Sequence, residues 1–150
     1  MEFDAISDAI ITEWLKRKKV KGLSPYENAN GFLKRECYRV ICHFIERRAV
    51  RFFESVIRRD GNALSSVIKI ADNPFHYGLT AMLVDQSVMT RNDKSLFSGQ
   101  MVYAYRHSIP PRLLVGFIYQ SGSNAELRRK LKAGTTEPGF EDQFRREIEI

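Results

Sequence analysis

Apolar residues recur with a helical period at the start of the chain. Between residues 2 and 19 they fall on one helical face, which holds Phe3, Ile6, Ile10 and Trp14, with Ile11 at its margin. Acidic residues lie in the first turns of this segment and a run of lysine and arginine ends it, which is the order that the helix macrodipole favours. We therefore predict an amphipathic helix over residues 2–19.

A longer helix is predicted in the next part of the chain. It begins at residues 24–27, where serine, proline and glutamate have the order of a capping box. From Leu33 the apolar positions keep the helical period until an Asp-Gly pair at 60–61. These positions are Cys37, Ile41, Phe44, Phe52 and Val56. An Asn-Gly pair at 30–31 is the expected bend, and the central helix is predicted from Leu33 to Arg59.

The middle of the chain contains two apolar runs, at residues 65–71 and 79–89, each bounded by Asp, Asn or Pro residues that favour turns. We predict two short helices there. Residues 99–122 fit two structures, because they are rich in β-branched and aromatic residues and contain a proline pair at 110–111. A helical face that continues through Tyr105, and the suitability of prolines for a helix start, favour helices over a β-hairpin.

Two signals mark the C-terminal part. Residues 123–126 form another capping box, and Gly134 lies where a helix is expected to end. A final amphipathic helix is expected to dock through Phe140, Phe144 and Ile148. With 150 residues and 43% hydrophobic content, the chain fits one domain. We predict a single mainly α-helical domain over residues 1–150, with about six or seven helices around the central one; an α+β fold with a hairpin in 99–122 is the alternative.

Positive charge is concentrated on the predicted central helix. Lys34 to Arg59 contains eight lysines or arginines against three glutamates, which accounts for five of the six net positive charges of the chain. Basic residues at intervals of four form a basic stripe, made of Arg35, Arg39, His43, Arg47 and Arg51, with Arg48 beside it. Because each interval turns about 40° past a full helical turn, the stripe wraps around the helix.

A wrapped row of arginines suits the phosphate backbone of a nucleic acid, since guanidinium groups pair with phosphate and displace counterions. A second basic cluster, which includes Lys16, Arg17 and Lys19, would extend this surface if it folded beside the stripe. Solvation and compensation of helix dipoles explain the same charges without a ligand. The prediction is a small non-enzymatic accessory protein that binds nucleic acid, with these basic residues as its phosphate contacts.

The alternative is a protein-interaction module, such as an adaptor or a secretion-associated component. In it the same arginines meet an acidic protein partner, and the pair Phe52-Phe53 anchors the interface. A homodimer through the long helix is a further option, although its apolar series follows a 3.6-residue period better than a heptad.

No motif for catalysis or cofactor binding is present in the sequence. The three histidines and two cysteines lack the spacing of zinc sites, and there is no glycine-rich phosphate loop and no local nucleophile pattern. We therefore expect no enzyme activity, no cofactor and no metal. Catalysis by dispersed residues would be sought first at Tyr103, Tyr105, Arg106 and His107, but a buried aromatic segment is the favoured interpretation.

The chain is expected to be soluble and cytoplasmic. Its first residues are acidic rather than basic, and the longest apolar run, Leu113 to Tyr119, is far shorter than the roughly 20 residues of a membrane span. Cys37 and Cys42 are five positions apart on one helix and point to different sides, so that no disulfide joins them. Export by a specialised secretion machine stays open.

Overall fold

The computed structural model describes residues 2–84, 88–140 and 147–150. Within these ranges it contains seven α-helices, one 3₁₀ helix and no β-strand. The elements are α1 (Glu2–Lys18), α2 (Ala29–Glu46), α3 (Arg51–Arg59), α4 (Pro74–Met82), α5 (Arg91–Arg106), η1 (Pro111–Leu113), α6 (Leu114–Gln120) and α7 (Asn124–Ala133). The predicted mainly α-helical fold is confirmed, and helices occupy the segment for which a hairpin was the alternative.

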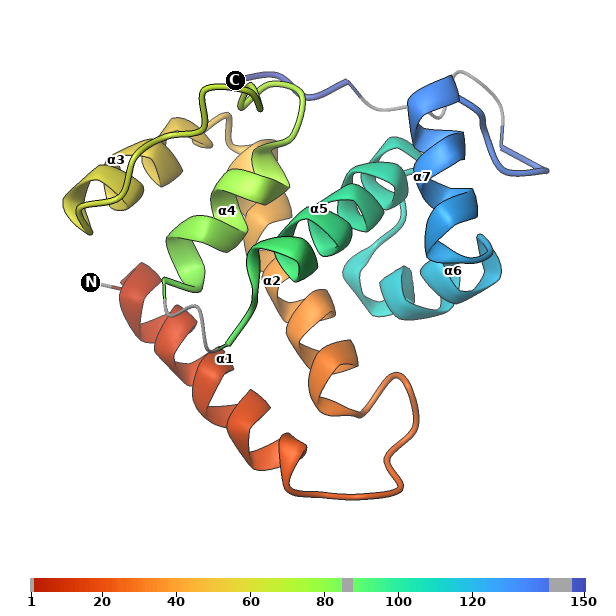
Figure 1. Cartoon of the computed structure of the whole chain (residues 1–150), viewed down its shortest axis with the longest axis horizontal. Coiled ribbons are helices and arrows are strands. Elements are labelled where there is room, and N and C mark those ends of the chain that lie inside the picture. The colour runs from red at the N-terminus through yellow and green to blue at the C-terminus, as the bar shows by residue number, and fades with distance from the viewer. Residues whose placement is uncertain (1, 85–87, 141–146) are drawn as a thin grey trace.

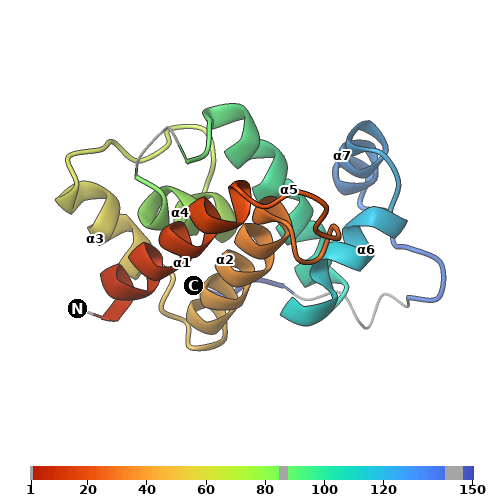
Figure 2. The same ribbon diagram turned by 90° about the horizontal axis from the view of Figure 1, so that it is seen from below.

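Helix α2 runs through the middle of the molecule (Figure 1). It packs against α1, α4 and α6, while α4 also packs against α3 and α5. Helices α6 and α7 lie together at the end of the molecule away from α3, as both views show (Figures 1 and 2). The core between these helices contains fully buried aromatic and aliphatic side chains, among them Tyr38, Phe53, Phe75, Leu79 and Met101.

The predicted central helix is wrong, because the chain turns sharply after α2 and restarts as α3. Arg48 has a left-handed backbone with φ of 53°, and the N–H of Ala49 donates to the carbonyl of Phe44 at 2.9 Å. The N–H of Arg48 donates to the carbonyl of Ile45 at 3.0 Å, which completes a Schellman turn. The expected signal of such a turn is glycine, and here an arginine occupies the position.

Aromatic packing explains why the helix breaks. The rings of Phe44 and Phe52 stack with centroids 5.3 Å apart, and Phe3 of α1 meets both of them edge-on. In a straight helix, two residues eight positions apart would be separated by about 12 Å along the axis. The turn therefore brings together side chains that a continuous helix would keep apart.

Helix α2 also begins later than predicted. Its N-cap is Asn28, whose side-chain oxygen accepts the N–H of Gly31 at 2.7 Å, whereas Ser24 organises a preceding turn. Gly31 does not bend the helix. A β-carbon at Gly31 would lie 1.9 Å from the carbonyl oxygen of Pro25, so that glycine lets the preceding loop pack closely.

The structure differs from three other predictions, wholly or in part. Residues 65–71 form turns and bends rather than a helix; the next helix is α4, which Asn73 caps and Pro74 begins. The run at 79–89 is helical only through Met82, and residues 85–87 lie outside the described residues. Ile6 is 43% exposed, although the predicted face included it, and Ser7 is buried instead.

The C-terminal predictions are confirmed in part. Ser123 and Glu126 form the expected capping box, and Gly134 ends α7 with a left-handed backbone. The predicted last helix, including Phe144, falls largely on residues 141–146, which lie outside the described residues. Its flanking residues Phe140 and Ile148 are not helical, and Ile148 packs against the core.

Candidate functional site

Arg35, the first member of the basic stripe, lies inside the protein. Its guanidinium stacks on the rings of Tyr26 and Phe32, at 4.3 and 5.3 Å from their centroids, and bonds to Glu36 at 3.3 Å. Only 7% of the residue is exposed. Arg35 therefore holds the loop before α2 against this helix and is not positioned to contact a phosphate.

The other stripe residues and Arg48 form an exposed basic surface on α2 and the turn into α3. This surface consists of Arg39, His43, Arg47, Arg48 and Arg51, all exposed. Arg39 and His43 lie four positions apart on α2, and Arg47, four positions further on, is the C-cap of this helix. Because the helix ends after Glu46, the last two reach the surface from the turn and from the start of α3.

Three of the arginines on the basic surface already have acidic neighbours. Arg39 pairs with Glu36 at 3.5 Å, Arg48 with Glu149 at 2.6 Å and Arg51 with Glu54 at 3.0 Å. Between 53% and 71% of each arginine side chain is exposed, and exposed pairs of this kind contribute about 1 kcal/mol or less. Arg47 has no ion pair or side-chain hydrogen bond within the described ranges. The surface can thus exchange its carboxylates for phosphates at low cost.

The second predicted cluster, at the end of α1, lies away from this surface. Arg17 bonds to Glu13 and Glu27 and stacks on Phe32, while Lys16 and Lys19 are exposed. Helix α1 ends beside the beginning of α2, whereas Arg47 follows the other end of α2 (Figure 1). An α-helix of this length separates its ends by about 25 Å, so the two clusters do not form one continuous site.

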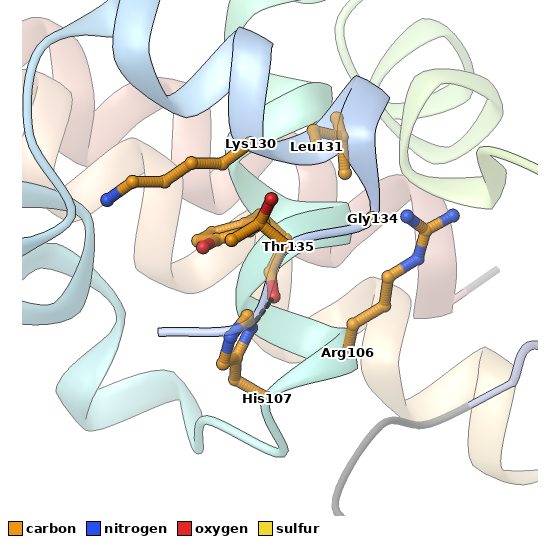
Figure 3. A pocket seen from close by; sticks show the side chains of 7 residues that line it. Arg106, His107, Lys130, Leu131, Gly134 and Thr135 are labelled. Atoms are coloured by element: carbon orange, nitrogen blue, oxygen red, sulfur yellow. Dashed lines mark hydrogen bonds between the residues drawn. The ribbon is translucent and has the colours of Figure 1, made fainter. Parts of the chain in front are cut away.

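The segment at which catalysis would be sought first is buried. Tyr103, Tyr105 and His107 are at most 4% exposed, which confirms the expected buried aromatic segment. Figure 3 shows His107, Arg106 and Lys130 around a small cavity. Its volume is about 10 Å³, which is space for one water molecule. No substrate could enter this cavity as it stands.

Hydrogen bonds made by these groups hold the segment after α7 against α5. Tyr103 donates a short hydrogen bond to Glu137, which also pairs with Lys130 at 2.9 Å. His107 Nε2 accepts the backbone N–H of Glu137 at 3.0 Å, so its Nδ1 carries the proton and donates to the Tyr103 carbonyl at 2.7 Å. Burial alone would raise the pKa of the Glu137 carboxyl, but the hydrogen bonds from Tyr103 and Lys130 bring it below the ordinary value. For Tyr103, burial and the carboxylate raise the pKa.

The anchor expected for a protein interface is also buried. Phe53 is fully buried in the core, and Phe52 is half-buried in its stack with Phe44. The prediction that Phe52-Phe53 anchors a partner is therefore wrong. Exposed apolar surface lies elsewhere, on α6, η1 and the loop at residues 24–26, where Leu113 is 46% and Tyr119 is 80% exposed beside a groove of about 620 Å³.

Comparison with known proteins found no match for this chain among protein-family models, curated proteins or solved structures. No helix in the described part of the chain is both long and apolar enough to cross a membrane. Among the same residues, no group of three or more His, Cys, Asp or Glu side chains is placed to hold a metal ion.

Proposed function

We propose that this protein binds nucleic acid without catalysis, through the phosphate backbone, using the basic surface formed by Arg39, His43, Arg47, Arg48 and Arg51. The observation that carries the proposal is that all five side chains are exposed, on α2, on the turn that follows it and at the start of α3. The exposed ion pairs there are weak competitors of a polyanion, because phosphate contacts also gain free energy from released counterions.

The size of the electrostatic effect follows from the number of contacts. If the four arginines each neutralise one phosphate of a single strand, the logarithm of affinity should fall with the logarithm of salt concentration with a slope of about −3. Such binding is tolerant of sequence, because phosphate contacts carry no direct sequence information.

Fluorescence anisotropy with labelled single- and double-stranded oligonucleotides tests the proposal. The variant Arg47→Glu/Arg51→Glu should bind much more weakly and have a slope reduced by about 1.4 on single strands. The matched control is Arg128→Glu/Arg129→Glu on α7, which makes the same change in net charge at two exposed residues and should retain most of the affinity. Far-UV circular dichroism establishes that both variants are folded. Equal binding by both variants would contradict a role for the basic surface.

An acidic protein partner at the same surface is the second candidate. It is favoured by one contact, in which Glu149 from the C-terminal segment pairs with Arg48 at 2.6 Å. In this contact a carboxylate from a segment without regular secondary structure meets the basic surface. In this case a labelled Glu-rich peptide should bind and lose affinity in the Arg47→Glu/Arg51→Glu variant, whereas oligonucleotides should not bind near physiological salt.

A further inference from the structure

A polar cleft of about 700 Å³ lies between the loop after α3, helix α4 and the first turns of α5. The loop and the start of α5 lie on the same side of α4 (Figure 2). The lining residues used here are Asn62 and Ser66 from the loop, His76 from α4, and Arg91, Asn92 and Lys94 from α5. The described lining includes two cationic side chains and no carboxylate.

The main observation in this cleft is a lysine, Lys94, whose ammonium has no partner in the described part of the chain. It lines the cleft and is 7% exposed, yet its ammonium makes no hydrogen bond or ion pair with any described residue. Burial, with a contribution from the charge of Arg91, lowers the pKa of Lys94. The ammonium nitrogen keeps contact with solvent at the cleft while the rest of the side chain is buried, and a partly desolvated charge without a counter-charge carries a free-energy cost. An anion in the cleft would remove that cost and supply the missing hydrogen-bond acceptor.

The start of α5 adds to this preference for an anion. The helix has 16 residues and is capped by Thr90, whose side chain accepts the N–H of Asp93. The N–H groups of the first two residues, Arg91 and Asn92, have no acceptor within the helix, and the helix dipole places partial positive charge there. Both residues line the cleft. Lys94 and the beginning of α5 thus attract negative charge into the same space.

His76 lines the cleft but adds no positive charge to it. It lines the cleft from α4, and burial together with the charge of Lys94 lowers its pKa, so that its ring is neutral at neutral pH. The fixed positive charge of the cleft therefore comes from Lys94 and Arg91. Two adjacent cations match a ligand with two negative charges, and the arginine can pair with it in a bidentate manner.

We propose that this cleft binds a phosphate monoester, with Lys94 and Arg91 and the start of α5 holding the phosphate. The volume lies in the range of small-molecule sites, and Asn62 and Ser66 across the cleft offer polar contacts to the rest of the ligand. The site is separate from the basic surface on α2, and it does not depend on nucleic-acid binding there.

Titration with inorganic phosphate, followed by ¹H–¹⁵N spectra, tests the site. The amide signals of Arg91, Asn92 and Ser95 should shift and saturate, with sodium chloride of equal ionic strength as the reference. Lys94→Met should weaken binding on the order of tenfold or more, since a charge-assisted contact is lost. It removes a partly desolvated charge and keeps the aliphatic stem, so the fold should persist. Lys69→Met, at an exposed lysine in the same loop region, is the matched control and should bind like the original protein.

Arg91→Gln provides a second variant in case Lys94→Met does not fold, and it should also weaken phosphate binding. At a phosphate concentration about 100 times the Kd, the melting temperature should rise by about 5–10 °C. Unchanged amide signals at the start of α5, or equal binding by Lys94→Met and Lys69→Met, would overturn the proposal.

Two further ligands distinguish the source of the phosphate. A nucleoside monophosphate that binds as tightly as a 5′-phosphorylated oligonucleotide supports a small-molecule ligand, and tighter binding of the oligonucleotide supports the end of a strand. In either case the 5′-hydroxyl oligonucleotide should fail to displace inorganic phosphate. Displacement by the 5′-hydroxyl oligonucleotide, equal to that by its phosphorylated form, would overturn a monoester site. Oligonucleotide binding that is lost in an Arg47 variant but kept in Lys94→Met would support nucleic-acid binding by the basic surface and would give no support to the cleft.

Discussion

Gly78 of α4 packs directly against Ile41 of α2, and replacing it with alanine should destabilise the protein. A β-carbon at this position would lie 2.5 Å from Cγ1 and 2.6 Å from Cδ1 of Ile41. Ile41 is fully buried, so its side chain has little room to move away. Alanine in place of glycine contributes up to about 1 kcal/mol through helix propensity, whereas overpacking a core costs about 1–3 kcal/mol.

We expect the steric term to dominate, because two atoms of Ile41 fall well inside normal contact distance. With a steric cost at the upper end of its range, Gly78→Ala should lower the free energy of unfolding by about 2 kcal/mol. For a chain of this length, that corresponds to a fall in melting temperature of about 4–8 °C. Urea unfolding followed by circular dichroism at 222 nm measures the difference.

Two other helical glycines are matched controls. A β-carbon at Gly116 would meet nothing within 4 Å, and one at Gly99 would meet only Leu131 at an ordinary 3.7 Å. Alanine at either position should therefore raise stability by about 0.5–1 kcal/mol. In an Ile41→Ala background, which removes all three contacting atoms, Gly78→Ala should become stabilising as well. If Gly78→Ala alone were as stable as Gly116→Ala, the argument from close helix packing would be refuted.

Two further predictions concern buried groups. Burial raises the pKa of the Cys37 thiol to about 12, so iodoacetamide should leave Cys37 unmodified in the native protein and modify it in urea, as mass spectrometry of digested samples would show; rapid native alkylation would contradict the burial. The pKa of Glu137 is held below its ordinary 4.5 in the folded protein, so its stabilising effect is full above the pKa of the unfolded carboxyl and is lost as the pH falls through the folded value. Urea midpoints should therefore fall more between pH 6 and pH 3.5 in the original protein than in Glu137→Gln, and equal falls would exclude this role.

Local sequence signals predicted the helical class and several helix ends. The Ser123–Glu126 capping box and Gly134 mark the limits of α7 because both act within one turn of the backbone. The charge order and apolar period of residues 2–19 likewise predicted α1 to within a residue at its C-terminal end. In each case the stabilising partners are close in the sequence, and their effect does not depend on the rest of the fold.

The candidate sites depended on contacts that no local pattern contains. The 3.6-residue period continues from Phe44 to Phe52, yet packing of both rings against Phe3 of another helix favours a turn between them, with Arg48 in a conformation that usually selects glycine. No local pattern in the sequence singled out Lys94, because its place at the cleft depends on the packing of α4 and of the loop after α3 around the start of α5.

The sequence by itself determined the mainly helical class, the limits of α1 and α7 to within a residue or two, and the concentration of excess positive charge between Lys34 and Arg59. The tertiary structure decided which of those charges face solvent: it stacked Arg35 on aromatic rings and exposed Arg47 at the end of α2. It also placed Lys94, outside that range, at a cleft with little of the residue exposed. The physical reason is that helix period and caps are set within a few residues. Whether a charged side chain is buried, paired or free depends on which distant elements pack around it.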